Sequence, residues 1–342
     1  MAIHEFDLVI TGAGPAGMTA ALYGARALLS TVVLERGEPG GELLNTEYLE
    51  NFISYPKVLG RDLAAKFAEH ARQAGAEIRE FINVEYVAKR EDGFFETVCD
   101  NGDIYVSPSV IVTAGGTPVK LGIPGELEYA GRGVSYCAVC DANFFKQQHI
   151  AVVGGGDAAV EESGYLSNYG SKVTLIHRRN EFRASRILQQ RLFENPKINV
   201  ILDTVAEEVL GENGLMTGLR LRNVETGETS VLDATGLFVF VGFKPNTGII
   251  RGHLEHDKMG YVITDSMTMM VPSVPGMFVA GDMRAQLTRQ VTTAAGDGTT
   301  AAIAAEKYVK GFMEAKREQR SAQTSEFRAI AESHADTTGL AR

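Results

Sequence analysis

Apolar runs alternate along the chain with glycine turns and helical stretches. Phe6–Thr11 (FDLVIT) is an apolar run typical of a buried strand, and a glycine-rich turn follows it. From about Ala16 to Leu29 the chain is rich in Ala, Leu and Met, which predicts a helix. Thr31–Glu35 (TVVLE) predicts a second buried strand. The first part of the chain therefore reads as strand, glycine turn, helix and strand.

The same pattern occurs a second time. His149–Val153 (HIAVV) predicts a strand, a Gly-Gly-Gly turn follows it, and a helical stretch extends to about Tyr169. Lys172–His177 (KVTLIH) predicts the next strand. One glycine motif alone is weak evidence, but a motif placed between a strand and a helix is much stronger. Two such units in one chain indicate two dinucleotide sites.

Both turns have the spacing of a dinucleotide-binding turn. Gly12 and Gly14 belong to the first (GAGPAG), and Ala159 stands at the third glycine position of the second (GGGDAA), a variant that the fingerprint allows. The first glycine permits the tight turn, the second lets the backbone approach a pyrophosphate, and the third position must be small. The phosphates then bind the free N–H groups at the helix N-terminus.

The two units differ where each second strand ends. Glu35 ends that strand in the first unit, and a carboxylate there accepts hydrogen bonds from ribose hydroxyls. In the second unit His177 has this place, and Arg178, Arg179 and Arg183 follow it. Guanidinium groups match the oxygens of a phosphate. The second unit is therefore predicted to bind NADP(H), and the first a dinucleotide with a free 2′-hydroxyl, either FAD or NAD.

Strand-type segments return after the second unit. Ala234–Thr247 predicts a buried strand with a Gly and Pro turn, and Val274–Met283 predicts a strand that ends in Gly-Asp. A helix rich in small residues is expected from about Gln290 to Phe312. We therefore predict an α/β fold with two Rossmann-like dinucleotide-binding domains, the second inserted into the first. The expected ranges are 1–117 and 247–320 for the first domain, 118–246 for the inserted domain and 321–342 for a polar, loosely docked C-terminal tail.

Composition and charge argue against several classes of protein for this chain. The 342 residues carry a net charge of −10, which disfavours general nucleic-acid binding because that relies on a positive field. The N-terminal sequence lacks the pattern of a secretory signal, and no apolar run approaches the length of a membrane helix. With only three cysteines, a disulfide framework is not expected. These features predict a cytoplasmic protein that does not bind membranes.

Two of the three cysteines, Cys137 and Cys140, form a Cys-x-x-Cys pair. Zinc would need further ligands, and the closest histidine, His149, begins a predicted strand, so no metal site is expected. A static disulfide would be unusual in the cytoplasm. The pair is therefore interpreted as a redox-active dithiol. Cys99, in an alternating segment, is interpreted as a buried strand residue.

Taken together, these motifs resemble the low-molecular-weight NADPH-dependent thioredoxin reductases. The resemblance covers about residues 5–312 and rests on GAGPAG, GGELLNTEYLENF, SYCAVCD, GGGDAAVEES, HRRNEFRAS, VGFKPNT, VAGDM and RQVTTAAGDG, in this order. It implies an FAD domain, an inserted NADPH domain that carries the Cys-x-x-Cys pair, a homodimer, and thioredoxin or a thioredoxin-like protein as partner.

The resemblance also implies a set of cofactor-binding residues. Those expected at the FAD adenosine and pyrophosphate are Gly12, Gly14, Pro15, Ala16 and Glu35. Those expected along the flavin are Gly40, Gly41, Glu42, Leu43, Asn51, Asp282, Arg289, Gln290 and Val291. Those expected at NADPH are Gly156, Asp157, Arg178, Arg179 and Arg183. Three places depart from the family: Glu42 replaces its usual Gln, residues 45–48 (NTEY) replace a threonine-rich run, and Ala142 replaces a usual Gly.

The implied reaction is a relay from NADPH through the flavin to the cysteine pair, with a domain rotation between its two halves. The resemblance assigns Cys140 to the flavin side and Cys137 to attack on the partner. Asp141 would manage the thiolate protons, or it would cap a helix as an N-cap residue. Competing interpretations are an oxygen-dependent dithiol oxidase, a ferredoxin-fed thioredoxin reductase and a flavin-binding redox sensor. The arginine trio argues against the first two, and the complete relay argues against the third.

Overall fold

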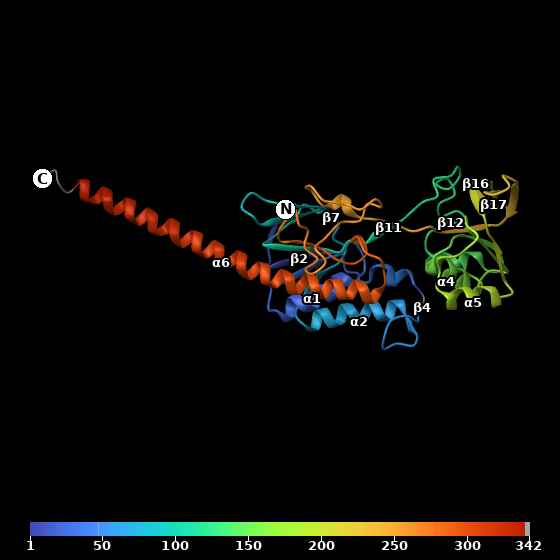
Figure 1. The fold of residues 1–342 in the computed structure, drawn as a ribbon, viewed down its shortest axis with the longest axis horizontal. Coiled ribbons are helices and arrows are strands. Elements are labelled where there is room, and N and C mark those ends of the chain that lie inside the picture. The colour runs from blue at the N-terminus through green and yellow to red at the C-terminus, as the bar shows by residue number, and fades with distance from the viewer. Residues whose placement is uncertain (47, 339–342) are drawn as a thin grey trace. The chain divides into compact units, whose positions relative to one another are not determined.

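The computed structural model describes residues 1–46 and 48–338 (Figure 1). The chain divides into two compact units. The first unit consists of residues 1–41, 64–115 and 246–342, and the second consists of residues 42–63 and 116–245. Each unit is built around a five-stranded parallel sheet, so the predicted α/β class with two similar halves is confirmed.

The central sheet of the first unit has the strand order β21-β10-β2-β3-β6. Its strands are β2 (Leu8–Thr11), β3 (Thr31–Leu34), β6 (Glu77–Arg79), β10 (Ser109–Val112) and β21 (Met277–Val279). A second sheet contains β1 (Ile3–Glu5), β7 (Val84–Lys89), β8 (Phe95–Cys99) and β9 (Ile104–Ser107). The helices are α1 (Pro15–Arg26), α6 (Val291–Thr338) and α2 (Gly60–Gln73), whose first turn falls in the second unit. The two segments that predicted strands on either side of the first glycine turn thus lie next to each other and parallel, as β2 and β3.

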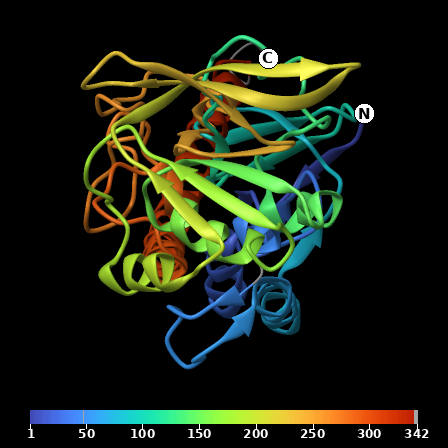
Figure 2. The same cartoon turned by 90° about the vertical axis from the view of Figure 1, so that its right-hand side faces the viewer.

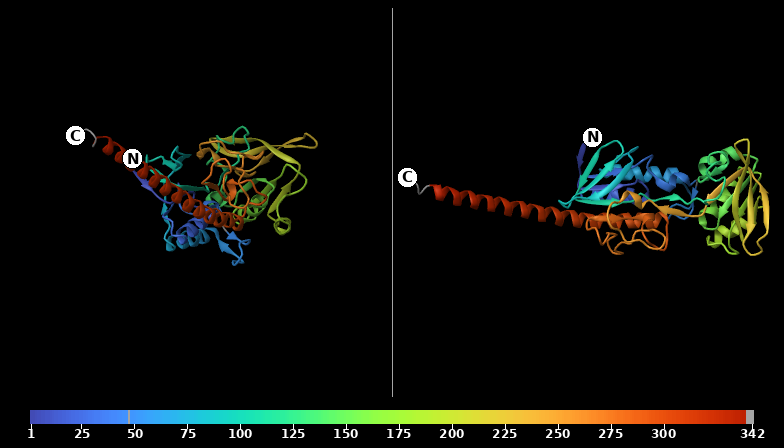
Figure 3. Two further views of the ribbon diagram at one scale, coloured as in Figure 1. Left: turned by 60° about the vertical axis from the view of Figure 1, so that its left-hand side comes forward. Right: turned by 90° about the horizontal axis from the view of Figure 1, so that it is seen from above.

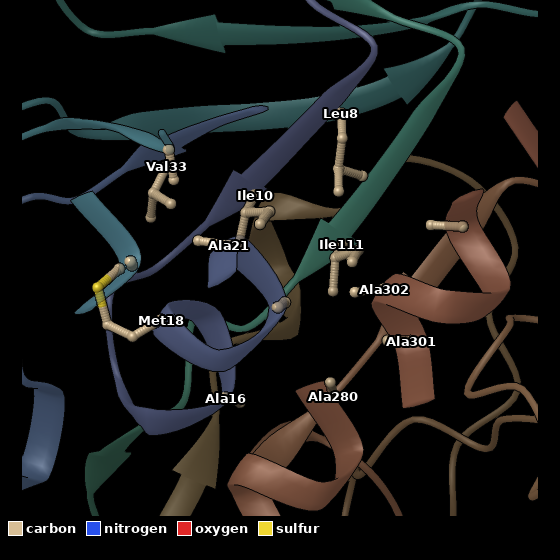
Figure 4. Packing of buried hydrophobic residues seen from close by; sticks show 14 of the residues in the cluster. Leu8, Ile10, Ala16, Met18, Ala21, Val33, Ile111, Ala280, Ala301 and Ala302 are labelled. Carbon is tan, nitrogen blue, oxygen red and sulfur yellow. The ribbon is translucent and has the colours of Figure 1, made fainter. Parts of the chain in front are cut away.

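Alternate residues of the central strands pack into two different hydrophobic clusters, one on each face of the sheet. Leu8 and Ile10 point to the side covered by α1 and α6, where they pack with Met18 and Ala301 (Figure 4). Val9 points to the other side and packs in one cluster with Phe95 and Tyr105 of the second sheet. Because both faces are covered, β2 is apolar at each of its first three positions, as expected for a buried parallel strand.

Helix α6 is longer than the sequence pattern indicates. It continues to Thr338 as one helix in the views of Figure 3 and so includes residues 321–338 of the predicted polar tail. The rest of that prediction, residues 339–342, lies outside the described residues. Residues 313–338 contain no Gly or Pro and are rich in Ala, Glu, Arg and Gln, which all favour helix. Polarity and periodicity predict no helix in this segment, because a helical period is visible only where apolar residues repeat.

The parallel sheet of the second unit has the order β12-β19-β13-β14-β15. Its strands are β12 (Val134–Ser135), β13 (His149–Gly154), β14 (Lys172–Ile176), β15 (Ile198–Ile201) and β19 (Gly236–Phe240). An antiparallel sheet contains β16 (Thr204–Glu212), β17 (Leu215–Asn223) and β18 (Thr229–Asp233). The helices are α3 (Ala138–Asp141), α4 (Asp157–Leu166) and α5 (Arg186–Glu194). Helices α4 and α5 cover one face of the parallel sheet and the antiparallel strands cover the other (Figures 1 and 2).

The breaks between the units lie close to the predicted domain boundaries. The second unit begins again at Gly116 and ends at Pro245. Strands β11 (Gly116–Pro118) and β20 (Phe243–Pro245) pair there as an antiparallel ribbon. The second unit also includes residues 42–63, with the short hairpin β4 (Tyr48–Leu49) and β5 (Val58–Leu59), which the sequence analysis placed in range 1–117. The division into an FAD and an NADPH domain stays a prediction.

Phe238 is expected to be a main stabilising residue of the second unit. Its side chain is fully buried in β19, and its ring meets that of Phe145 edge to face at 5.4 Å between centroids. Phe238→Ala should lower the free energy of unfolding by about 3–5 kcal/mol through lost burial and a cavity. Val231→Ala, at an exposed position of β18, is the control and should change it by less than about 0.5 kcal/mol. Urea denaturation measures both, and equal effects would contradict this account of the core.

Candidate functional site

The first glycine turn connects β2 to α1. Gly12 adopts the left-handed region (φ +99°), and a Cβ there would lie 2.5 Å from the backbone oxygen of Thr113, so a side chain does not fit. Pro15 is the first residue of α1, and Gly14 precedes it without a side chain that caps the helix. The N–H groups of the first helical turn therefore keep their capacity to bind an anion.

The carboxylate of Glu35 binds the backbone of this turn. Its Oε2 accepts a hydrogen bond from the backbone N of Ala13 at 2.7 Å, and its Oε1 accepts one from the backbone N of Gly37 at 3.0 Å. A cavity of about 310 Å³ opens beside it. Its walls include Thr11, Gly12, Leu34, Glu35, Ile82, Val84, Ala114 and Asn246. The cavity combines apolar walls with the Glu35 carboxylate, and Arg36 and Asn83 also line it. A mostly apolar site with a few polar groups suits an adenosine.

The segment after β3 approaches the same turn. The backbone N of Gly40 donates to the oxygen of Ala13 at 2.8 Å, and Gly41 follows with a left-handed backbone. A Cβ on Gly14 would point toward Gly41 and meet nothing closer than 4.0 Å. The second glycine of the motif thus leaves space above the helix N-terminus, which a pyrophosphate needs. These residues fit the nucleotide half of FAD.

The remaining residues expected along the flavin are spread over both units. Glu42, Leu43 and Asn51 belong to the second unit, where Leu43 is buried and the other two are exposed. Asp282 and Arg289 belong to the first unit. Because each unit is described by itself, the two groups are not placed relative to each other, and their joint role stays a prediction.

Asp282 occupies the 3₁₀ turn after β21, next to the start of α1. Burial raises the pKa of its carboxyl; the charge of Arg289 opposes this rise, and the charge of Asp297 adds to it. The guanidinium of Arg289 stacks on the ring of Tyr261 at 3.6 Å. Gln290 follows it, and Val291 is the first residue of α6. The structure therefore brings these four predicted residues to one helix start.

The imidazole of His177 packs against the second glycine turn. A Cβ on Gly155 would lie 2.1 Å from this ring, so a side chain does not fit there. Burial lowers the pKa of His177, and its Nε2 lies 3.0 Å from the backbone oxygen of Glu181. A Cβ on Gly156 would meet nothing within 4 Å, and no side chain caps α4. The site keeps the same open space and free N–H groups as the first turn.

Hydrogen bonds hold the arginine segment against this turn. The backbone N of Arg183 donates to the oxygen of Gly155 at 2.8 Å, and Asp157 Oδ1 accepts from the backbone N of Ser185 at 2.6 Å. Arg178, Arg179 and Arg183 are all exposed. The segment that carries these three exposed arginines is therefore held against an open helix N-terminus, where the 2′-phosphate and pyrophosphate of NADPH would find opposite charge.

Cys137 and Cys140 form a disulfide. Cys137 is the N-cap residue of α3, and its Sγ accepts a hydrogen bond from the backbone N of Cys140 at 3.2 Å. Cys137 is half-buried and Cys140 is exposed. Asn45 Oδ1 lies 3.6 Å from the Sγ of Cys137 and 4.0 Å from that of Cys140. Because a backbone N–H points at Cys137 Sγ, a thiolate there would be stabilised after reduction.

Asp141 follows directly and is half-buried. It is the N-cap residue of the short turn Ala142–Phe145, but its side chain makes no capping hydrogen bond. Its backbone N donates to the oxygen of Cys137 at 3.3 Å. The carboxylate is thus not used as a helix cap, which leaves it available to exchange protons with the thiols.

Sequence reasoning missed a pair that supports the cysteine loop. Glu126 is 1% exposed and accepts hydrogen bonds from the backbone N of Leu121 at 2.8 Å, the backbone N of Gly122 at 2.6 Å and the hydroxyl of Tyr136 at 2.8 Å. Tyr136 directly precedes Cys137. The interaction fixes the backbone on the N-terminal side of the disulfide. A buried glutamate carries no local sequence signal, since only the fold provides its partners.

A second cavity, of about 260 Å³, lies between the hairpin β4–β5 and helices α4 and α5. Glu50 and Arg191 pair across it, with Oε2 and Nη1 2.6 Å apart. Glu161 also lines it, and burial raises the pKa of Glu161 to about 7, with smaller contributions from Asp157 and Glu50 that Arg191 opposes. Glu50, Glu161 and Arg191 were not among the residues predicted from the sequence.

The raised pKa of Glu161 predicts a pH-dependent stability. From about pH 4.5 to 7 the folded state binds a proton that the unfolded state has released, so Glu161 destabilises the fold progressively as pH rises. Glu161→Gln should therefore raise the unfolding free energy at pH 8 by ~1–2 kcal/mol and leave it nearly unchanged at pH 4. Thermal melts at both pH values measure this. Glu212→Gln at the exposed end of β16 is the control, and an equal gain there would contradict the assignment.

Within residues 1–46 and 48–338, no three His, Cys, Asp or Glu side chains are grouped so that they could hold a metal ion. In the same part of the chain, no helix combines the length and the apolar composition that a membrane span requires.

Comparisons with known proteins agree with this geometry. The family described as pyridine nucleotide-disulphide oxidoreductase matches residues 6–298. The chain is similar to proteins named thioredoxin reductase. It is 44% identical to that of Listeria innocua over 91% of this chain and 96% of the relative. It is 42% identical to that of Bacillus subtilis over 90% of this chain and 96% of the relative. The crystal structure of Lactococcus lactis thioredoxin reductase, FR conformation, superposes with a TM-score of 0.86 at 42% identity, over 90% of this chain and 99% of that one.

Proposed function

The chain belongs to the pyridine nucleotide-disulphide oxidoreductase family, and we propose that it uses NADPH and FAD to reduce thioredoxin. The resemblance to thioredoxin reductases seen in the sequence is confirmed. The enzyme is a flavoprotein disulfide reductase of this class, and Cys137 and Cys140 are its redox-active pair. The observation that carries the proposal is the Cys137–Cys140 disulfide beside a nucleotide-binding turn in one compact unit.

Two features support the choice of cofactors. Glu35 presents a carboxylate to the cavity at the first turn, which suits a ribose with free hydroxyls and hence FAD. Arg178, Arg179 and Arg183 at the second turn suit a 2′-phosphate and hence NADPH. FAD would be held by the glycine turn, Glu35 and the Asp282 segment, and NADPH by Gly156, Asp157 and the arginines.

The chain's own chemistry is a thiol–disulfide exchange. Bound FAD would supply an electron pair, taken as hydride from NADPH, for the Cys137–Cys140 disulfide. Two electrons and two protons convert this disulfide into two thiols. The Cys137 thiolate attacks the disulfide of thioredoxin and forms a mixed disulfide, with one thioredoxin thiolate as leaving group. The Cys140 thiolate then attacks Cys137 Sγ, which restores the Cys137–Cys140 disulfide and releases reduced thioredoxin.

The local structure supports different roles for the two sulfurs. Cys137 Sγ receives the backbone N–H of Cys140, which favours its thiolate and makes it the better nucleophile toward the partner. The carboxylate of Asp141, without a capping hydrogen bond, would take the proton from one thiol and return it during the exchange. The Glu126–Tyr136 pair keeps the loop in place while the S–S bond opens and closes.

The proposal extends to partner and location. A homodimer and a cytoplasmic location follow from the resemblance to thioredoxin reductases and from the low cysteine content. An oxygen-dependent dithiol oxidase or a ferredoxin-fed reductase would have no use for the exposed arginine trio, which favours the NADPH-dependent reaction.

Anaerobic mixing tests the cofactor assignment. The purified protein is mixed with NADPH, and separately with NADH, while the flavin absorbance is followed without thioredoxin. Rapid bleaching by NADPH and slow bleaching by NADH is the expected result. Equal rates with both nucleotides would contradict the role of the arginines, and no bleaching with either would reject NADPH as electron donor.

A further inference from the structure

Gly281, the residue before Asp282, is held at both of its peptide groups. Its N–H donates to Asp297 Oδ2 at 3.1 Å, and its oxygen accepts from Gln286 Nε2 at 3.0 Å. Its backbone is left-handed (φ +74°), and a Cβ there would lie 2.9 Å from the Cβ of Ala16 on α1. Any movement of this residue would therefore move the Asp282 carboxylate relative to the start of α1.

Arg284 joins the two side chains that hold Gly281. Its Nε and Nη2 donate to Asp297 at 3.0 and 2.9 Å in a bidentate pair, and Nη2 also donates to Gln286 Oε1 at 3.0 Å. The side chains of the ion pair are only 15% and 8% exposed. Gly281, Asp297, Arg284 and Gln286 thus form a closed hydrogen-bonded ring, here named the Gly281 ring.

We propose that Arg284, Gln286 and Asp297 are positioning residues for the flavin, because they fix the direction in which Asp282 presents its carboxylate. The proposal rests on the proposed function, which puts Asp282 in the FAD site. None of the three residues was among those predicted from the sequence. They act through Gly281 and are not expected to contact the cofactor themselves.

The Gly281 ring also connects three elements of the first unit. Asp297 lies in the second turn of α6, Gly281 follows β21, and Ala16 belongs to the first turn of α1. Figure 4 shows Ala280, the residue that follows β21, in the same view as Ala16 of α1 and Ala301 of α6. Both helix starts and the Asp282 turn are therefore kept in one fixed arrangement, as a bound dinucleotide requires.

The ring has an electrostatic role in addition to its mechanical one. Asp297 and Arg289 are the two charged side chains that act on Asp282, with opposite signs. Arg284 neutralises Asp297 through the bidentate pair. Loss of the Arg284 charge would leave an uncompensated negative charge beside Asp282, and loss of the Asp297 charge would leave an uncompensated positive one. The potential of a flavin at Asp282 should follow these signs.

The test uses the full-length protein and five variants. FAD is titrated into the apoprotein to give a dissociation constant, and the midpoint potential of the bound flavin is measured with reference dyes. The variants are Arg284→Gln, Asp297→Asn, the double variant of both, Gln286→Leu, and the control Arg222→Gln, which removes an Arg–Glu207 pair in the second unit.

Each ring variant should weaken FAD binding by about tenfold, the effect of one lost buried hydrogen bond to a charged group. Arg284→Gln should shift the midpoint potential negatively and Asp297→Asn positively. The double variant and Gln286→Leu should stay near the parent potential, and Arg222→Gln should change neither quantity. If the Arg284→Gln protein does not fold, the neutral double variant and Gln286→Leu still test the loss of binding.

Two results would overturn the inference. One is a lower melting temperature of the ring variants with unchanged FAD affinity and potential, which would make the ring purely structural. The other is a potential that shifts in the same direction in Arg284→Gln and Asp297→Asn. If the parent apoprotein does not bind FAD, the proposed function itself fails, and this outcome is visible before any variant is compared.

Discussion

Replacing Cys140 by serine is expected to abolish the reduction of thioredoxin, while NADPH still bleaches the flavin. The variant lacks the sulfur that closes the disulfide with Cys137, so electrons can enter the protein but cannot leave through a dithiol. Loss of a residue that takes part in bond formation typically lowers kcat by ~10³-fold or more. The measurement is NADPH oxidation with oxidised thioredoxin, together with anaerobic bleaching without it.

Cys99 provides the matched control. It is a free cysteine, 1% exposed, and burial raises its pKa to about 12, with additional contributions from nearby carboxylates. A thiol of this kind is protonated at neutral pH and is not a nucleophile. Cys99→Ala should therefore retain full turnover. Thioredoxin reduction by Cys140→Ser at the parent rate, or its loss in Cys99→Ala, would contradict the assignment of the redox pair.

Replacing Arg178 and Arg179 together by glutamine is expected to raise the KM for NADPH by about 100-fold. Each substitution would remove one hydrogen bond between an exposed guanidinium and the 2′-phosphate. Such a bond to a charged group contributes about 1.5 kcal/mol to binding at the lower end of the usual range. NADH has no such phosphate, so its KM should change little. The preference for NADPH over NADH would then largely disappear.

Arg186 is the matched control for this second prediction. It is exposed at the first position of α5, eight residues beyond Arg178 in the same segment. Arg186→Gln should leave the KM of both nucleotides unchanged. Steady-state kinetics with each nucleotide settles the comparison. An equal rise of both KM values in Arg178→Gln/Arg179→Gln would indicate a general distortion of the turn and not the loss of a phosphate contact.

The dinucleotide turns could be predicted from the sequence because their chemistry is local. Gly12 has a left-handed backbone in the turn itself, and Glu35 directly follows the next strand. A local motif with a fixed spacing can therefore be recognised in the sequence before the fold is known. The same holds for Cys137 and Cys140, whose separation already limits the possible chemistry.

Other residues of the site acquire their roles only in the folded chain, and the sequence around them does not predict these roles. Asn246 enters the first cavity although it is far from Gly12 in the sequence, and Glu126 acquires its role only when Tyr136 folds against it. Arg284 and Asp297 meet because α6 packs beside β21, a contact that no local pattern encodes. The grouping of residues 42–63 with the second unit likewise follows from tertiary contacts.

The central claim is that electrons from NADPH leave the protein through Cys137 and Cys140 to thioredoxin. The most direct measurement is the NADPH consumed, at 340 nm, after addition of a limiting amount of oxidised thioredoxin, with its free thiols counted at the end. The account predicts one NADPH consumed and two thiols formed per thioredoxin disulfide, and no consumption beyond the flavin and dithiol of the enzyme when thioredoxin is absent. Continued NADPH oxidation without new thiols, with oxygen as the acceptor, would contradict it.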